Sequence, residues 1–226
     1  MIERILIVGL GSIGKRHLRL ARELCPDADI QVLRHQKSKV VPEFANGCWF
    51  HLDEALDFCP QIAVIANPAS MHLDVAKPLA AKGVHLLIEK PLAASSEEVQ
   101  AFLDTCADNK VHLMVGYNLR FLPSLQEFRK LLHKGIIGKI LSVRCEAGQN
   151  LLAWRPDTDY RKTVSAQSKL GGGVLLELSH EIDYLRWIFG EISWVKASCS
   201  RQSNLEIDVE DTVHAKRPLA STLFTT

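Results

Sequence analysis

A glycine pattern near the start of the chain restricts the possible folds more than any other part of the sequence. Residues 4–8 form a short apolar run typical of a buried strand, and Gly9, Gly11 and Gly14 follow it with the spacing G-x-G-x-x-G. A helix is predicted directly afterwards, over residues 13–25. In this context Gly9 permits a tight turn, Gly11 lets the backbone approach a pyrophosphate, and Gly14 allows close packing of helix on strand. The pattern predicts a dinucleotide cradle at a helix N-terminus, and the alternative is a tight turn without a ligand.

The rest of the chain divides into two patterns. In the first half, apolar runs alternate with helical patterns, which is typical of a doubly wound parallel sheet covered by helices. The further strands predicted there are 30–34, 62–66, 85–89 and 112–115, with helices at 70–82 and 97–109. Later residues predict helices at 123–133 and 177–189 and alternating strands at 139–149, 192–200 and 207–215. We expect an α/β Rossmann domain over 1–118, followed by an incomplete α+β domain over 119–226 with an open, mostly antiparallel sheet.

The residues after the second predicted strand indicate which dinucleotide is bound. A carboxylate about 20 positions after the glycines binds the ribose hydroxyls of NAD, whereas an arginine accommodates the 2′-phosphate of NADP. This chain has Arg34 there, followed by His35, Lys37 and Lys39, with no carboxylate before Glu43. Because these cations attract a phosphate, we expect NADP, with NAD as the second choice. The alternative is a solvated basic loop.

Composition limits the class of partner. The net charge of +1 gives no reason to expect nucleic acid or a membrane surface. No apolar run approaches the roughly 20 residues of a membrane helix, and the first residues lack the apolar region of a signal peptide. The six cysteines stand singly, without a C-x-x-C pair or a histidine at zinc spacing. We therefore expect reduced thiols, no bound metal and a cytoplasmic location.

Two polar segments follow the ends of other predicted strands. Glu89, Lys90 and Pro91 end one strand, and Asn67 with His72 follows another. Ligands gather outside the carboxyl ends of strands in open α/β sheets, so both segments are expected near the dinucleotide. A lysine at such a place can exchange a proton with a reacting hydroxyl. Taken singly, each segment is as typical of an ordinary strand end followed by a turn as of a functional site.

Together these segments resemble the Gfo/Idh/MocA family of oxidoreductases, over nearly the whole chain to about Val213. The matching stretches, in the family's order and spacing, are IVGLGSIG at 7–14, ANP at 66–68 with His72, EKP at 89–91, GYNLRF at 116–121, and GGG at 171–173 running on to HEID at 180–183. The resemblance implies reversible hydride transfer between a nicotinamide and a hydroxyl of a sugar, nucleotide sugar or cyclitol. It also implies a homo-oligomer formed through the C-terminal sheet.

The resemblance implies roles for single residues. Lys90 would hydrogen-bond the reacting oxygen and relay its proton, and Pro91 would follow a cis peptide bond. His180 would act opposite as acid, base or orienting group, with Asp183 binding substrate hydroxyls or holding the imidazole tautomer. The residues implied to bind the cofactor are Gly9, Gly11, Ser12, Ile13, Gly14, Arg34, Asn67, His72, Glu89, Lys90 and Asn118. Those implied to bind the substrate are Arg120, Trp154, Arg155, Tyr160 and Glu177.

The segment from Trp154 to Arg161 resembles a loop of relatives that are encoded with surface-sugar biosynthesis genes. Its arginines suit an acidic or phosphorylated sugar, and Trp154 suits stacking on a sugar ring. An exposed, salt-bridged loop is the alternative. For His180, the alternative is a satisfied core or surface histidine.

Two departures from the family pattern stand out. The family commonly has an aspartate four residues before the histidine, but here that position is Leu176 and the carboxylate is Glu177. The family pattern also ends after about Ala215, so we expect a C-terminally truncated member. A non-catalytic dinucleotide-binding regulator or a degenerate member is therefore the alternative to an enzyme.

Overall fold

The computed structural model describes residues 1–35, 40–154 and 156–217. The chain forms two units, Met1–Gly116 and Tyr117–Thr226. No helix in these described ranges is long and apolar enough to cross a membrane.

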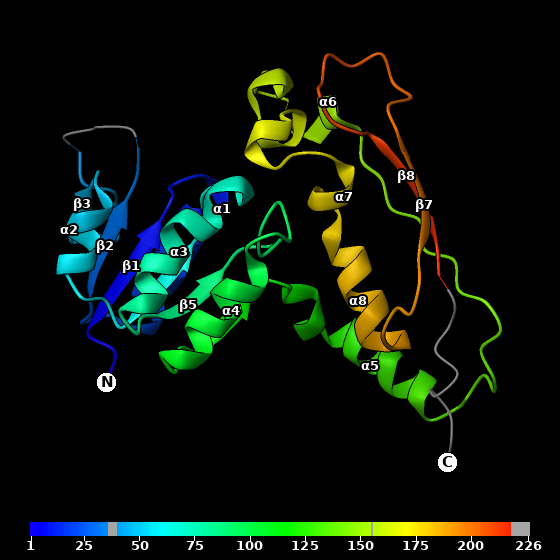
Figure 1. Ribbon diagram of the computed structural model, residues 1–226, viewed down its shortest axis with the longest axis horizontal. Coiled ribbons are helices and arrows are strands. Elements are labelled where there is room, and N and C mark those ends of the chain that lie inside the picture. The colour runs from blue at the N-terminus through cyan, green and yellow to red at the C-terminus, as the bar shows by residue number, and fades with distance from the viewer. Residues whose placement is uncertain (36–39, 155, 218–226) are drawn as a thin grey trace. The chain divides into compact units, whose positions relative to one another are not determined.

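The first unit is built on a parallel six-stranded sheet with the order β3-β2-β1-β4-β5-β6 (Figure 1). The strands are β1 Arg4–Val8, β2 Asp29–Leu33, β3 Gly47–Trp49, β4 Ile62–Ile65, β5 His85–Ile88 and β6 Leu113–Val115. The strand order reverses between β1 and β4, and such a switch point is where open α/β sheets bind ligands at the carboxyl ends of their strands. The predicted doubly wound sheet is confirmed.

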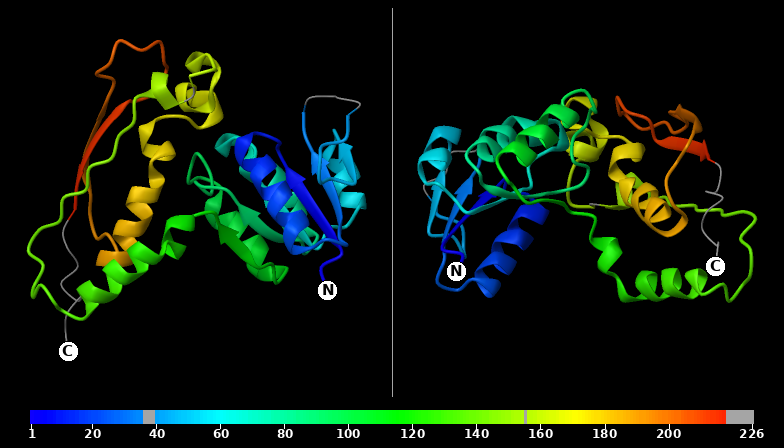
Figure 2. Two further views of the ribbon diagram at one scale, coloured as in Figure 1. Left: turned by 180° about the vertical axis from the view of Figure 1, so that it is seen from behind. Right: turned by 60° about the horizontal axis from the view of Figure 1, so that its bottom comes forward.

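Helices cover both faces of this sheet (Figure 2). They are α1 Ser12–Leu24, α2 Leu52–Asp57, α3 His72–Ala81 and α4 Val99–Asp108, and a 3-10 helix, Ala69–Met71, precedes α3. Alternation along β1 explains the two layers, because successive side chains point to opposite faces. Ile7 belongs to a core cluster with Leu18 of α1, whereas Leu6 belongs to a second cluster with Phe102 of α4. All four side chains are at most 2% exposed, and each buried side chain of this size contributes about 1.5–3 kcal/mol.

Two short elements of the first unit, a strand and a helix, were not predicted from the sequence. β3 has three residues, lies at the sheet edge and, among the residues that the structure describes, pairs only with β2. The helix α2 has six residues and only Ala55 buried. Both are too short to show a hydrophobic period, and their positions depend on contacts with residues distant in sequence.

The second unit packs helices against one another and carries a small sheet. Its elements are α5 Pro123–His133, α6 Leu151–Trp154, α7 Val174–Glu177, α8 Ser179–Phe189, β7 Lys196–Ser200 and β8 Thr212–Lys216, with 3-10 helices Asn118–Phe121, Tyr160–Lys162, Val164–Ala166 and Ser168–Leu170. Leu132 of α5 forms a buried cluster with Ile188 and Phe189 of α8. Arg129 reinforces this contact, since its Nε donates to the Trp187 carbonyl at 3.1 Å. The expected antiparallel sheet is formed by β7 and β8.

The strand predicted over residues 139–149 is wrong. These residues belong to no strand, and Leu141 is 82% exposed. Within the part of the chain that the structure describes, β7 and β8 pair only with each other. Alternation shows which side chains would share a face, but a strand also needs a hydrogen-bonded neighbour. The predicted helix 177–189 is interrupted at Leu178, between α7 and α8.

Candidate functional site

The loop of residues 9–14, the glycine loop, lies at the switch point. At two of its positions only glycine fits, because a Cβ there would collide with neighbouring backbone. Gly9 follows β1 with a φ of +86°, and its N–H donates to the Leu33 carbonyl at 2.9 Å. A Cβ at Gly9 would lie 2.8 Å from the carbonyl carbon of Ala66, which follows β4. A Cβ at Gly14, in the first turn of α1, would lie 2.1 Å from the carbonyl oxygen of Gly9. These residues hold the end of β1 and the start of α1 in close contact.

Gly11 differs from both, because it faces open space. It is the N-cap of α1, it is exposed, and a Cβ built on it would meet no atom within 4 Å. Ser12 and Ile13 after it are also exposed. Gly11 has no side chain with which to cap the N–H groups of this first turn, and these groups have no partner within a helix. The loop therefore fits the pyrophosphate of a dinucleotide, since it offers uncrowded donors at a helix N-terminus.

Arg34 directly follows β2, whose last carbonyl accepts the Gly9 N–H. The residue is half-buried, and its backbone N–H donates to the Trp49 carbonyl at 3.1 Å. Its Nη2 donates to the Val40 carbonyl at 2.9 Å, and the guanidinium carbon lies 6.0 Å from the centre of the Phe50 ring. The structure thus places this cation at the same sheet edge as the glycine loop. Lys37 and Lys39 of the predicted basic loop lie outside the described residues.

Residues 89–91, the Lys90 segment, follow β5 at this same edge. The peptide bond between Lys90 and Pro91 is cis, as the resemblance implied. The buried ring of His72, 1% exposed, connects this segment to the one after β4. Its Nδ1 lies 2.9 Å from the Pro91 carbonyl oxygen, and its Nε2 lies 2.9 Å from that of Asn67. His72 is thus placed to hold the two segments together, and its contact with a cofactor stays a prediction.

The contact between Glu89 and His17 was not predicted from the sequence. Oε1 of Glu89 lies 2.6 Å from Nε2 of His17 on α1, and Oε2 of Glu89 accepts the backbone N–H of Lys90 at 3.2 Å. Burial alone would raise the pKa of Glu89, but the hydrogen bond and attraction of His17, followed by those of Lys90, lower it below its ordinary value. One feature of the sequence could have indicated this contact: His17 lies three residues after Gly14, so both residues are on the same face of α1.

The burial of His72 predicts a pH-dependent stability. Burial lowers its pKa, although the carbonyls of Asn67, Pro91 and Leu92 and the charge of Glu89 oppose the shift. The unfolded chain, with a histidine pKa of about 6.5, then binds a proton more readily than the folded chain. The free energy of unfolding should therefore fall as the pH drops below about 6.5 towards the folded-state pKa. The corresponding loss from Glu89 falls at lower pH, because its folded pKa lies below 4.5.

We expect His72→Gln to reduce the free energy of unfolding at pH 8 by about 1–3 kcal/mol, because a single amide nitrogen cannot span the Asn67 and Pro91 carbonyls that the two ring nitrogens of His72 contact. The variant should also lose the part of the pH dependence that begins near pH 6.5. Urea unfolding between pH 4.5 and 8, followed by circular dichroism, measures both effects. His214→Gln, at an exposed position on β8, is the control. An unchanged pH slope in His72→Gln would contradict this assignment.

In the second unit, two predicted site residues pair with each other. Arg120 donates to both carboxylate oxygens of Asp183, from Nε at 2.8 Å and from Nη2 at 2.6 Å. Asp183 is buried, and its hydrogen bonds raise the pKa of the Arg120 guanidinium. Asp183 was expected to contact substrate or hold an imidazole, and Arg120 to bind substrate. Their bidentate pairing shows that each orients the other, and both roles stay predictions.

His180 lies on the same helix, α8, one turn before Asp183. The Tyr117 ring meets the imidazole edge-on, with the ring centres 5.7 Å apart. Residues 117–121, which include Asn118, thus meet α8 through both His180 and Asp183. The structure thus brings Arg120 to α8, which also carries His180, although 63 residues separate Arg120 from its partner Asp183.

A cavity of about 620 Å³ lies in the second unit. Its walls are formed by residues of three segments and by Ser165; the segments contribute 149–152 and 154, then 173, 174, 177 and 178, and finally 202–205, 207 and 209–212. Trp154 and Glu177 both line it, and Ser165 donates to the Glu177 carboxylate at 2.9 Å. The structure therefore joins two of the predicted substrate residues in one cavity.

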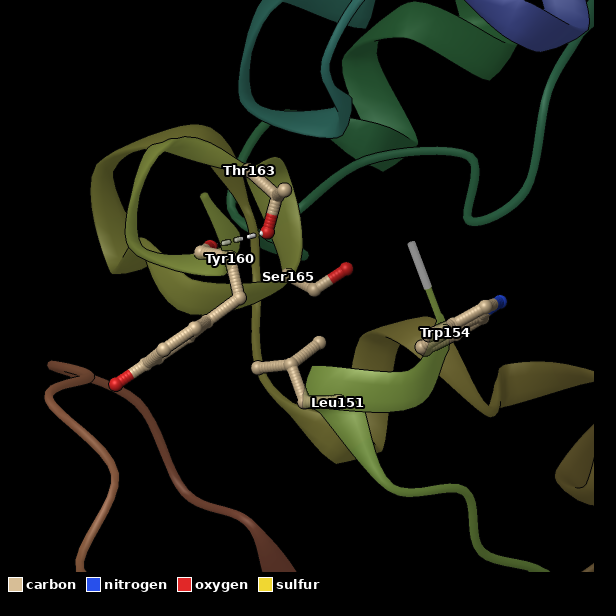
Figure 3. A pocket seen from close by; sticks show the side chains of 5 residues that line it. All are labelled: Leu151, Trp154, Tyr160, Thr163 and Ser165. Atoms are coloured by element: carbon tan, nitrogen blue, oxygen red, sulfur yellow. Dashed lines mark hydrogen bonds between the residues drawn. The ribbon is translucent and has the colours of Figure 1, made fainter. Parts of the chain in front are cut away.

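A smaller pocket adjoins this cavity and contains Tyr160 (Figure 3). Trp154 and Ser165 line both spaces, and Thr163 donates to the Tyr160 carbonyl at 2.6 Å. The Tyr160 hydroxyl accepts the backbone N–H of Glu206 at 3.2 Å. Arg161 binds the carboxylates of Asp159 and Glu206, as the alternative of a salt-bridged loop predicts for that residue. Arg155 lies outside the described residues.

Comparison with known proteins matches each of the two units to a known domain family. Residues 3–117 match the family described as "Oxidoreductase family, NAD-binding Rossmann fold", and residues 125–221 match the "GFO/IDH/MocA C-terminal domain". The chain is 30% identical over 196 residues to the rhizopine catabolism protein MocA of Rhizobium meliloti, which covers 83% of this chain and 57% of MocA. It is 28% identical over 218 residues to scyllo-inositol 2-dehydrogenase (NADP(+)) IolU of Bacillus subtilis (strain 168), covering 93% and 65% of the two chains.

A solved structure of levoglucosan dehydrogenase in complex with NADH and levoglucosan is similar with a TM-score of 0.79 and 27% identity. The match covers 96% of this chain and 64% of that one. The chain thus spans between 57% and 65% of the length of these relatives. Because the two family matches together extend over both units, this chain belongs to the Gfo/Idh/MocA family of oxidoreductases.

Proposed function

We propose that this protein is an oxidoreductase that uses NADP for reversible hydride transfer at a hydroxyl of a sugar or cyclitol. The supporting observation is the carboxyl edge of the parallel sheet. The glycine loop follows β1, Arg34 follows β2, and the Lys90 segment follows β5. The register pairs Val8 with Leu33 and with Ile65, so the strand ends coincide at the switch point. This edge gathers groups that suit a dinucleotide and a proton carrier.

The choice of NADP rests on Arg34. The names of the relatives include both an NADH complex and an NADP(+)-dependent enzyme, so family membership does not select the cofactor. A guanidinium after β2 binds a 2′-phosphate through charge-assisted hydrogen bonds, whereas the carboxylate of an NAD-specific site would repel it. His35, which is exposed beside Arg34, adds a further donor at this place.

Lys90 is the proposed proton carrier. When bound, the nicotinamide supplies the centre that accepts or returns a hydride. The Lys90 ammonium would hydrogen-bond the reacting oxygen, and it would take up or return the hydroxyl proton. The segment around it is anchored on both sides, because Glu89 binds its backbone N–H and His72 binds the Pro91 carbonyl. We infer a second proton-handling role for His180, because an imidazole side chain can take up a proton at one ring nitrogen and give one from the other.

The cavity of the second unit supports a polyhydroxylated ligand. Its volume of about 620 Å³ falls within the roughly 300–1,000 Å³ of typical small-molecule sites. Gln149, Asn150 and Gln202 contribute amide groups to the lining, Glu177 contributes a carboxylate, and Trp154 contributes a flat apolar ring. Amides and carboxylates hydrogen-bond hydroxyl groups, and an aromatic ring packs against the apolar face of a sugar. Association of copies through the edges of β7 and β8 remains part of the proposal, since exposed strand edges favour pairing.

The cofactor choice is tested by replacing Arg34 with aspartate. NADPH should bind the unaltered protein more tightly than NADH does. Arg34→Asp should weaken NADPH binding by about 10- to 100-fold, because a charge-assisted interaction of about 1.5–3 kcal/mol is replaced by repulsion. NADH binding should be retained or improved. Fluorescence titration of both dinucleotides, side by side, measures the four dissociation constants.

Arg144→Asp, at a highly exposed position in the second unit, is the charge-matched control and should leave the affinities for NADPH and NADH unchanged. Thermal melting of Arg34→Asp checks that the contacts of Arg34 to Val40 and Phe50 are not needed for folding. Tighter binding of NADH than NADPH to the unaltered protein would overturn the cofactor choice. Failure to bind either dinucleotide would overturn the proposed function itself.

A further inference from the structure

A short contact links the helix of the glycine loop to the proton-carrying segment. His17 Nε2 on α1 lies 2.6 Å from Glu89 Oε1, across 72 residues of sequence. Both side chains are largely enclosed, with exposures of 19% and 16%. The contact therefore joins α1 to the Lys90 segment after β5, and both lie in the first unit.

The Glu89 carboxylate is held at several points. Its second oxygen accepts the backbone N–H of Lys90 at 3.2 Å, while its own backbone N–H donates to the Ile65 carbonyl at 2.8 Å. A Cβ at Gly116 would come within 3.1 Å of the carboxylate, so this residue leaves it just enough space. The carboxylate is thus shared between His17 and the Lys90 backbone, and it fixes the direction in which the chain leaves β5.

The charges agree with this arrangement. His17 and Lys90 lower the pKa of Glu89 although burial opposes them, so the carboxylate is ionised at neutral pH. An ionised carboxylate only accepts hydrogen bonds, and therefore Nε2 of His17 must be the donor in the 2.6 Å contact. A hydrogen bond to a charged group in an enclosed place restrains both partners more strongly than a neutral one.

We propose that His17 is a positioning residue for Lys90. It holds the Glu89 carboxylate against the Lys90 backbone amide, and so it couples the position of the dinucleotide-binding helix to that of the residue that handles the substrate proton. This inference rests on the proposed function, because Lys90 is assigned as proton carrier there. Loss of His17 would displace Lys90 while leaving the glycine loop intact.

The test compares His17→Leu, which lacks a donor, with His17→Gln, whose amide nitrogen has a reach similar to that of Nε2. His17→Leu should lower kcat by about 100-fold, the order of effect that a misplacement of about 1 Å produces. His17→Gln should recover most of that loss, while the NADPH dissociation constant of both variants stays close to that of the unaltered protein. A purely structural role predicts equal losses in both variants that follow their melting temperatures.

A second readout does not depend on turnover. In protein labelled with ¹⁵N-lysine and free of dinucleotide, the Lys90 amide resonance is assigned by its absence in Lys90→Met. It should shift, and exchange faster with solvent, in His17→Leu but not in His17→Gln. His85→Leu, at the opposite end of β5, is the matched control and should leave the resonance unchanged. If His17→Leu does not fold, His17→Asn, which keeps an amide too short to reach Glu89, replaces it.

An unshifted Lys90 amide in the variant without a donor, or no recovery with glutamine, would overturn the positioning role. The proposed function fails separately, through normal turnover in Lys90→Met or through no turnover in the unaltered protein. In either case the amide resonance still decides whether His17 positions Lys90.

Discussion

Lys90→Met should lower kcat by about 1,000-fold or more, within the range by which a positioned acid–base group accelerates a reaction. Methionine keeps most of the unbranched stem of lysine but has no proton to give and no positive charge. The NADPH dissociation constant should change little, because the glycine loop and Arg34 are separate from the Lys90 side chain. Rates are measured from the absorbance of NADPH, with a panel of sugars and cyclitols in the presence of NADP.

Lys82→Met, at an exposed position after α3, is the matched control and should keep the activity of the unaltered protein. Near-normal turnover in Lys90→Met would contradict the role of Lys90. If instead the unaltered protein binds NADPH but turns over none of the panel, the result favours the alternative of a non-catalytic dinucleotide-binding protein. The fluorescence titration described above distinguishes that result from a failure to bind either dinucleotide.

Gly14→Ala should reduce the free energy of unfolding by about 3 kcal/mol or more, at the upper end of the cost of overpacking. The added Cβ would lie 2.1 Å from the carbonyl oxygen of Gly9, and backbone cannot move aside as a flexible side chain can. Gly9 itself has a φ of +86° and contacts Ala66, so the strain would spread to β4. NADPH binding should be lost together with stability, as measured by urea unfolding and fluorescence titration.

Gly11→Ala adds the same methyl group to the same loop, but it should separate the two effects. A Cβ there meets no protein atom within 4 Å, so stability should change by no more than about 0.5 kcal/mol. NADPH binding should nevertheless weaken by at least about tenfold, because the methyl group projects where the pyrophosphate approaches the backbone. Unchanged NADPH affinity in Gly11→Ala would show that this loop is not the cradle. Unchanged stability in Gly14→Ala would show that the helix can move away from the strand.

The elements with strong local signals were predicted from the sequence. β1, α1 and the glycines between them are adjacent in the chain, so spacing alone defines them. The 139–149 segment shows the limit of such reasoning, because its alternation predicts a strand but contains no information on a partner strand. The short elements β3 and α2 are the reverse case, since they form through neighbours and carry almost no period of their own.

The fold of the first unit, and the strand ends that carry its candidate site residues, could be predicted from the sequence. The glycine spacing, the basic residue at 34 and the segment at 89–91 each follow a strand, and the carboxyl ends of parallel strands share one edge. The pairing of side chains from distant parts of the chain, in contrast, was known only once the tertiary structure was available. His17 meets Glu89 across 72 residues, and Asp183 meets Arg120 across 63. Periodicity reports the face on which a residue lies, whereas its partner depends on how separate elements pack. For that reason the glycine loop could be predicted from the sequence, whereas the contact between His17 and Glu89 could not.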